Sequence, residues 1–375
     1  MLSRIKIVYV IPTLDMNEGG GILEFLYLLV KYLDHNYYQV DILVFYSSQA
    51  DSIAFEEVGA TVHIAFPRKE NNTYLSLFKW LSEKMRALRP QIVHTNIYWA
   101  DTLGREVAFK CGIPVVITTA HSATTWESDE QKAVKKKLLL KTDAVICNTY
   151  SVKSYSVEVD NIDEAMIQVI PCAFNIDRYA TGIADIAGLS KRCYSVGRLV
   201  EAKNPLGLIT AFADVVSEDP ECKLICIGDG PLRDECQLLV ESLNMRDVIF
   251  MAGYKGNPFK SVEPGSVFIL NSSNEGQGIV LLEAMAQGLI CIAPDCDGIP
   301  EVITHEVNGF LFKKNDAEAL KATIRQVLSM DLNFLNQIRR SAYEEVLEKF
   351  NPKKMSDRYA MVYERLLKSK LSYAD

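Results

Sequence analysis

Two glutamates, Glu275 and Glu283, stand eight residues apart on either side of a glycine-rich turn. The segment is typical of a strand end, a turn and a helix starting near Ile279, and Gly276 and Gly278 let the backbone come close to a ligand. The first N–H groups of such a helix can bind sugar hydroxyls or phosphate oxygens. Glu275 would enter the same space, and Glu283 could accept hydrogen bonds from a diol. A solvated glutamate and a surface helix glutamate fit the spacing equally well.

Two cations form the second pattern, because Arg198 and Lys203 follow Ser195-Val196-Gly197 and precede a helix that starts at Pro205. Breaking the bond to a nucleotide diphosphate develops negative charge on the leaving oxygen, and two fixed cations can stabilise that charge. Both lie where ligands bind in α/β folds, after a strand and before a helix. The alternative is a pair of exposed basic residues in a surface turn.

Three further candidate segments directly follow predicted strands. Gly19-Gly20-Gly21 separates the strand Ile5–Ile11 from a helix starting near Ile22, either as a phosphate-binding turn or simply as a flexible one. Gly228-Asp229-Gly230 is another strand-to-helix turn, and Tyr254 follows a strand end where its ring could stack on a base. Among the histidines, His94 is interpreted as a structural residue, whereas His121 remains a candidate for the site.

The string from Glu275 to Gly288, followed by Gly298-Ile299-Pro300-Glu301 and Asn308-Gly309-Phe310-Leu311, resembles glycosyltransferase family four. The resemblance covers nearly the whole chain and is strongest from Tyr194 to Leu311. It implies the GT-B architecture of two Rossmann-like domains facing a central cleft. It also implies a nucleotide-sugar donor, retention of anomeric configuration, and no metal or other cofactor.

The same resemblance assigns roles to residues. It implies that Glu275 contacts the donor sugar, that Arg198 and Lys203 hold the diphosphate, and that His121 positions the sugar or hydrogen-bonds to it. Gln277 departs from the family, which commonly has an aromatic residue there, and this leaves the donor sugar open. The expected donor-binding residues are Gly20, Gly21, Gly197, Tyr254, Gly276, Gln277, Gly278, Ile279 and Glu283.

Elements that could position these residues alternate between short β-branched runs and amphipathic segments, the pattern of a parallel sheet with helices on both faces. The runs in the first half are Ile5–Ile11, Val40–Phe45, Thr61–Phe66, Ile92–Thr95, Val115–Thr118 and Ala144–Cys147. The pattern restarts with Cys193–Val196, Leu224–Ile227, Val248–Met251, Val267–Leu270 and Ile290–Ala293. We therefore expect an α/β fold with two Rossmann-like doubly wound domains, at 1–177 and 178–351. The stretch from Pro171 to about Ser190 suits a linker and the entry to the second domain, and a C-terminal helix within 352–375 returns to the first domain.

Composition excludes several classes of protein. A chain of 375 residues suits two domains, and a net charge of −8 argues against a nucleic-acid partner. The nine cysteines include no Cys-x-x-Cys pair and indicate a reducing compartment. The apolar run that ends at Ile11 is too short to span a bilayer, so we expect a cytoplasmic protein. Asp295-Cys296-Asp297 has the form of a manganese motif, but it lies in a loop of the resembling family, and we expect no metal there.

The expected partners are a nucleotide-sugar, UDP-linked first and GDP-linked next, and a glycan or lipid-linked acceptor in surface polysaccharide assembly. Lysines from Lys132 to Lys141 interleave with apolar residues, which suggests either a solvated helix face or contact with an anionic membrane, at its inner face. Two other functions fit the architecture: a nucleotide-sugar 2-epimerase, which needs no acceptor, and a catalytically silent nucleotide-sugar-binding module.

Overall fold

The computed structural model describes residues 4–67, 73–123, 127–260 and 262–372. The chain forms two compact units. The first contains the chain up to Ala173 and the segment from Pro352 onward, and the second runs from Phe174 to Asn351. The chain therefore passes from one unit to the other twice.

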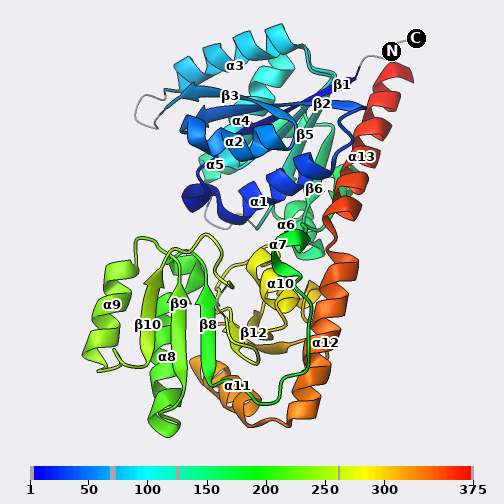
Figure 1. The fold of residues 1–375 in the computed structure, drawn as a ribbon. Helices are drawn as coiled ribbons and strands as arrows, with labels where there is room; N and C mark the ends of the chain where they lie inside the picture. The colour runs from blue at the N-terminus through cyan, green and yellow to red at the C-terminus, as the bar shows by residue number, and fades with distance from the viewer. Residues whose placement is uncertain (1–3, 68–72, 124–126, 261, 373–375) are drawn as a thin grey trace. The chain divides into compact units, whose positions relative to one another are not determined.

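The first unit is a seven-stranded sheet of order β3-β2-β1-β4-β5-β6-β7, with parallel pairing throughout (Figure 1). Its elements are β1 (Ile5–Ile11), α1 (Met16–Tyr32), β2 (Tyr38–Tyr46), α2 (Gln49–Glu57), β3 (Ala60–Phe66), α3 (Tyr74–Leu88), β4 (Ile92–Asn96), α4 (Tyr98–Lys110), β5 (Val115–Ala120), α5 (Asp129–Leu139), β6 (Ala144–Cys147), α6 (Tyr150–Glu158), η2 (Glu164–Met166), β7 (Ile167–Val169) and α13 (Pro352–Ser372). Strand β1 is central, and its residues from Ile7 to Ile11 are fully buried because both faces of the sheet are covered.

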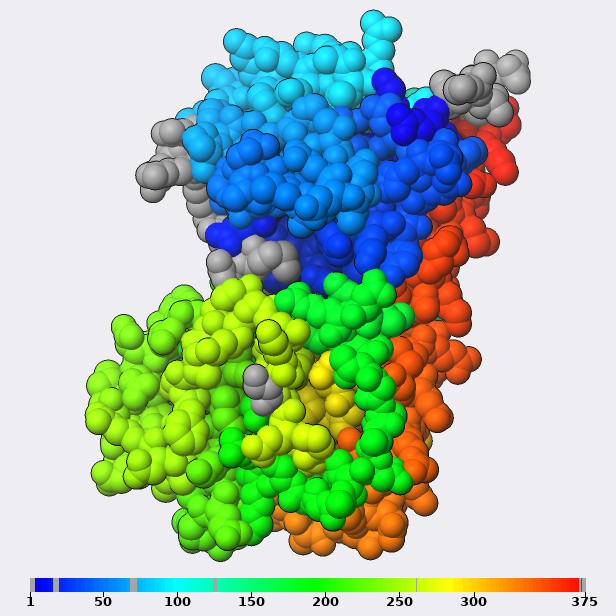
Figure 2. Space-filling model, in the orientation of Figure 1, coloured from blue at the N-terminus to red at the C-terminus, as the bar shows by residue number. Residues whose placement is uncertain are grey.

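Helix α13 returns from the end of the chain to the first unit, where it lies along α1 (Figures 1 and 2). Tyr359 and Tyr363 point their rings into the unit and are fully buried. The Tyr363 hydroxyl lies 2.8 Å from Nδ1 of His94 and 3.0 Å from the Tyr9 hydroxyl, so the helix is attached by a buried polar network as well as by apolar contacts.

The second unit repeats the design with a six-stranded parallel sheet of order β10-β9-β8-β11-β12-β13. Its elements are α7 (Ile176–Tyr179), β8 (Arg192–Val196), η3 (Glu201–Lys203), α8 (Pro205–Glu218), β9 (Lys223–Ile227), α9 (Arg233–Ser242), β10 (Ile249–Gly253), β11 (Val267–Ile269), α10 (Ile279–Ala286), β12 (Ile290–Asp295), η4 (Ile299–Glu301), β13 (Phe310–Lys313), α11 (Ala317–Ser329) and α12 (Leu332–Lys349). Two apolar clusters pack against this sheet. The prediction of two doubly wound α/β domains is therefore confirmed.

Most of the segment expected as a linker and the entry to the second domain belongs to the second unit. Phe174, Tyr179 and Ile186 are all buried, and the first two belong to an apolar cluster of the second unit. Alanine, glycine and aspartate dominate the composition of this stretch, but a few large apolar residues decide its packing. The second unit therefore begins at Phe174, inside the predicted linker.

Candidate active site

Most of the donor residues predicted in the second unit follow two neighbouring strands, β8 and β11. From β8 the chain moves outward to β9 and β10, and from β11 it moves the other way to β12 and β13. Such a reversal of strand order opens a crevice at the carboxyl ends of the two strands, which is the usual ligand site of a doubly wound sheet. The fold thus brings the turn after β8 beside the turn after β11.

Hydrogen bonds tie these two turns together. The backbone N–H of Ser273 donates to the carbonyl of Ala202 (2.8 Å), and the Asn271 side-chain amide donates to the carbonyl of Asn204 (3.1 Å). Asn204 itself has a left-handed backbone, with φ of 44°, and its side chain caps α8. The loop after β8 is therefore fixed against the loop after β11.

An ion pair between Lys203 and Glu275 joins the two predicted patterns. Their side chains are 28% and 13% exposed, so the pair is largely shielded from water. The backbone N–H of Glu275 donates to the Asp297 carboxylate (3.0 Å), which fixes the glutamate from a second side. Arg198 has an exposed side chain and no ion pair among the described residues, so its guanidinium is available to an anion.

Gly228 and Gly230 hold the Arg198 segment in place. From the sequence they were predicted only as part of a strand-to-helix turn. A Cβ at Gly228 would lie 1.8 Å from the carbonyl oxygen of Gly197, and one at Gly230 would lie 2.5 Å from that of Leu199. Both glycines have positive φ, at 149° and 156°. The turn after β9 thus packs backbone to backbone on the turn that carries Arg198, and only glycine fits.

The N-terminus of α10 meets the same edge of the sheet. Its N-cap is Gly278, with φ of 73°, so no side chain caps the helix, and no acidic residue stands in its first turn. The uncapped N–H groups and the positive end of the helix dipole favour an anion or a hydroxyl here. Glu283 is partly buried at the fifth helical residue, and Gln277 is buried at 2% exposure.

Two further residues that the sequence analysis considered, Tyr254 and Asp297, also belong to the second unit. Tyr254 directly follows β10, and its side chain is 52% exposed. Asp297 accepts from Glu275 and lies 3.7 Å from the Lys314 ammonium, so it is engaged in protein contacts. Within the described residues, no group of three or more histidine, cysteine, aspartate or glutamate side chains could hold a metal ion.

In the first unit, His121 follows β5 and is held on several sides. Its Nε2 lies 3.0 Å from Oδ1 of Asn96, its Nδ1 lies 4.0 Å from the Cys172 sulfur, and the Phe25 ring packs edge-on at 5.0 Å. Burial lowers the pKa of His121 to about 4, so the imidazole is neutral at physiological pH. His121 can therefore position a hydroxyl or donate a hydrogen bond, but it cannot supply a permanent charge.

The remaining predictions for the first unit concern Gly20, Gly21 and His94. Gly20 has φ of 48° and ψ of −130° and kinks α1, so the predicted turn lies inside a helix that begins at Met16 instead of near Ile22. His94 is fully buried between Tyr363 and Thr119, whose oxygens lie 2.8 and 2.7 Å from its ring nitrogens. Burial, with a smaller contribution from His121, lowers its pKa to about 3. The interpretation of His94 as structural is confirmed.

Two family models match the chain. Residues 19–178 match Glycosyltransferase Family 4, and residues 185–345 match Glycosyl transferases group 1. A relative from Escherichia coli, the UDP-Gal:alpha-D-GlcNAc-diphosphoundecaprenol alpha-1,3-galactosyltransferase, is 27% identical over 79% of both chains. A 4-alpha-N-acetylgalactosaminyltransferase from Campylobacter jejuni that acts on a diphospho-undecaprenol-linked saccharide is 25% identical over 60% of this chain and 61% of its own.

Among solved structures, the fold is similar to that of HepE from Anabaena in complex with UDP and glucose. The TM-score is 0.83 at 18% sequence identity, and the match covers 96% of this chain and all of the other. At that identity the likeness establishes the fold.

Proposed function

The chain belongs to glycosyltransferase family 4, and from this premise we propose that it moves a hexose or N-acetylhexosamine from a nucleotide-sugar to a glycan or lipid-linked acceptor. The observation that carries the proposal is the Lys203–Glu275 pair beside exposed Arg198 and the uncapped start of α10. These groups suit a sugar diphosphate: cations and helix N–H groups for the phosphates, and a carboxylate for the sugar hydroxyls. A UDP-linked donor is proposed first, since the E. coli relative is named for UDP-Gal and HepE was solved with UDP.

In the proposed mechanism, an acceptor hydroxyl oxygen forms a bond to the anomeric carbon while the bond from that carbon to the nucleotide diphosphate breaks. The hydroxyl proton passes to the departing diphosphate, and attack on the face that the diphosphate leaves retains the configuration. Arg198 and Lys203 would neutralise the charge on the leaving oxygen without a metal. Glu275 would orient the sugar; its engagement with Lys203 argues against its acting as a nucleophile.

The test is thermal denaturation with UDP, GDP, ADP and their common sugar conjugates in EDTA, using wild type, Arg198→Ala and Arg192→Ala. Arg192 is the matched control, because it starts strand β8 and pairs with Glu263 (3.0 Å). We expect one nucleotide family to stabilise wild type and Arg192→Ala, with about a tenfold weaker affinity for Arg198→Ala. No stabilisation by any nucleotide, or a requirement for a divalent metal, would contradict the donor site and favour a silent module.

Action in the cytoplasm, at the inner face of a membrane, is proposed with it. No helix in the described part of the chain is long and apolar enough to cross a bilayer. Helix α5 and its C-cap expose Val134, Lys137 and, at 91% exposure, Leu140, which suits contact with an anionic surface. Co-sedimentation with anionic vesicles at low salt tests this contact, and a protein that stays in the supernatant contradicts it.

A further inference from the structure

A pocket of about 410 Å³ lies within the first unit. Its described lining comes mostly from the β4–α4 turn and helix α4, the end of β5, helix α5 and the end of α6. His121 and Ile22 stand among the lining residues, so the pocket adjoins the candidate histidine of this unit. Its size suits a sugar-sized or drug-sized molecule.

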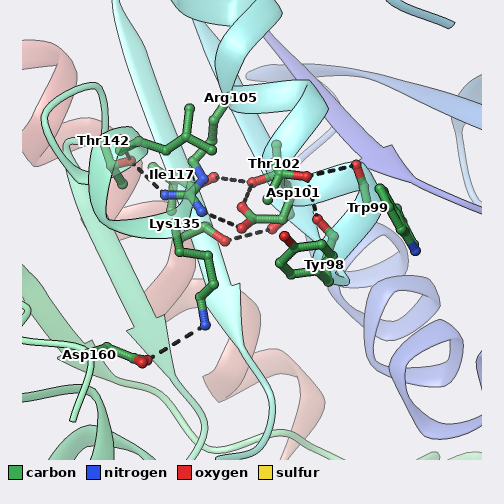
Figure 3. A network of polar contacts seen from close by, with 12 residues as sticks. Tyr98, Trp99, Asp101, Thr102, Arg105, Ile117, Lys135, Thr142 and Asp160 are labelled. Atoms are coloured by element: carbon green, nitrogen blue, oxygen red, sulfur yellow. Dashed lines mark hydrogen bonds and ion pairs between the residues drawn. The ribbon is translucent and has the colours of Figure 1, made fainter. Parts of the chain in front are cut away.

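One part of the lining is a buried ion pair between Asp101 and Arg105, two residues of α4 that are 7% and 1% exposed (Figure 3). Asp101 also accepts from the Thr95 hydroxyl (2.6 Å), and Arg105 donates to the Thr142 hydroxyl (3.2 Å). The Nε–H of Arg105 is buried and has no acceptor among the described residues. The Asp101–Arg105 pair contributes no net charge to the pocket. Its Arg105 Nε–H remains a hydrogen-bond donor without an acceptor among the described residues.

A second part is Lys135 of α5, which bridges Glu127 (2.9 Å) and Asp160 (3.6 Å). Figure 3 shows its ammonium directed at Asp160. Burial raises the pKa of Asp160, with Lys135 acting in the opposite direction. The Lys135 ammonium is thus shared by two carboxylates. The oxygens of these carboxylates can accept hydrogen bonds from sugar hydroxyls.

Two more lysines of α5, Lys132 and Lys136, line the same pocket without an ion pair among the described residues. They are four residues apart and so share one helix face, where like charges repel each other. Lys137, on the same helix, is not part of the lining. An anion between Lys132 and Lys136 would remove the repulsion.

The β4–α4 turn contributes aromatic side chains and a strained backbone to the lining of the pocket. Ile97 has φ of 65° and ψ of 135°, a conformation that β-branched residues rarely adopt, and strain of this kind gathers at functional sites. As the N-cap of α4 it provides no side-chain acceptor for the first helical N–H groups. Trp99 is 66% exposed and packs edge-on against Tyr98 at 5.4 Å, which leaves a ring surface for the apolar face of a sugar.

We propose that this pocket binds the acceptor and that the acceptor is a saccharide with a phosphate or diphosphate at its reducing end. This inference rests on the proposed transferase function. Lys132 and Lys136 bind the phosphate, Trp99 packs against the sugar ring, and the carboxylates accept from its hydroxyls. The phosphate can belong to a free sugar phosphate or to a lipid carrier, since the chemistry that the lysines recognise is the same.

The experiment compares two double variants of full-length protein. Lys132→Ala/Lys136→Ala removes the two lining lysines that have no ion pair among the described residues, and Lys137→Ala/Lys141→Ala removes the same charge from the same segment outside the pocket. The probes are N-acetylglucosamine, N-acetylglucosamine 1-phosphate, and the same sugar on a farnesyl diphosphate, with binding measured by calorimetry at low salt. We expect the lining variant to lose about tenfold or more in affinity for the phosphorylated probes, and the control to lose little.

The two phosphorylated probes separate the sources. Equal binding of both assigns the site to the phosphorylated saccharide itself, and tighter binding of the farnesyl form assigns it to a lipid-linked one. The proposal would be overturned if both double variants lost affinity equally, or if the unphosphorylated sugar bound as tightly as the phosphorylated probes. It would also be overturned if the lining variant bound all three probes like wild type and lost only its co-sedimentation with anionic vesicles. Nucleotide stabilisation of the same variants, measured in parallel, reports on the donor site, so a failure of the proposed function is seen separately.

Discussion

At the scale of residues, the candidate donor site depends on what surrounds its charged groups. The Lys203–Glu275 pair is largely shielded from solvent, and Asp297 and the turn after β8 fix its two sides. Partial shielding strengthens electrostatic interactions relative to those of an exposed pair. A charge already fixed in position needs little reorganisation when a diphosphate departs.

The first prediction at this scale concerns Gly228, whose Cβ would lie 1.8 Å from the Gly197 carbonyl oxygen. Gly228→Ala must displace the Arg198 turn, and we expect nucleotide affinity to fall by about tenfold or more. The measurement is nucleotide binding by calorimetry, with far-UV circular dichroism to verify folding. Gly256→Ala is the control, since a Cβ there meets nothing within 4 Å. Wild-type affinity in Gly228→Ala would show that the turn's position does not matter to the donor.

At the scale of elements, α13 illustrates how a distant segment completes a domain. Its Tyr363 hydroxyl is shared by His94 and Tyr9, and its Tyr359 ring stacks against His94 at 5.7 Å. Burial raises the pKa of Tyr363 well above its usual range, so the hydroxyl stays protonated. The helix is therefore part of the core of the first unit.

The second prediction follows from that network. Tyr363→Phe leaves buried polar atoms of His94 and Tyr9 without a partner, and we expect the free energy of unfolding to fall by about 1–3 kcal/mol. Urea denaturation followed by circular dichroism measures the loss. Tyr37→Phe is the control, because the Tyr37 side chain is 46% exposed. A midpoint shift no larger than that of the control would mean that the hydroxyl adds nothing to the attachment of α13.

The two shortest edge strands show the limit of prediction from local sequence patterns. Strands β7 and β13 have three and four residues and were not predicted as strands, although Phe310 and Leu311 of β13 belong to the string that carries the family resemblance. Alternation over so few residues cannot be told from a loop. Both are edge strands, and only pairing with β6 and β12 makes them strands.

At the scale of the whole molecule, the two units share one topological plan. In each, the first strand lies beside the fourth, β1 beside β4 and β8 beside β11, so each unit has a switch point of its own. In the second unit that point gathers the residues proposed for the donor. In the first, the turn after β4 contributes Ile97, Tyr98 and Trp99 to the pocket proposed for the acceptor. The two proposed binding sites, which differ in chemistry, thus both lie at switch points of the same architecture.

The sequence by itself determined the class of fold and the family, and it supplied the residues proposed for the donor site. Strand runs, glycine turns and the Glu275–Glu283 spacing are all local, so one stretch of chain is enough to specify them. The buried role of His94 was also predicted correctly. In the stretch predicted as a linker and the entry to the second domain, the second unit begins at Phe174, because a few buried side chains outweigh the average composition.

Only the tertiary structure decided which of these residues meet. Lys203 and Glu275 are 72 residues apart, and they form a pair because β8 and β11 are neighbours in the sheet. The pocket gathers Asp101, Lys135 and Asp160 from three different helices or their ends, and none of them carries a motif. Local patterns specify strands and helices but leave open the order of strands in a sheet. That order decides which strand ends, and therefore which charges, lie side by side.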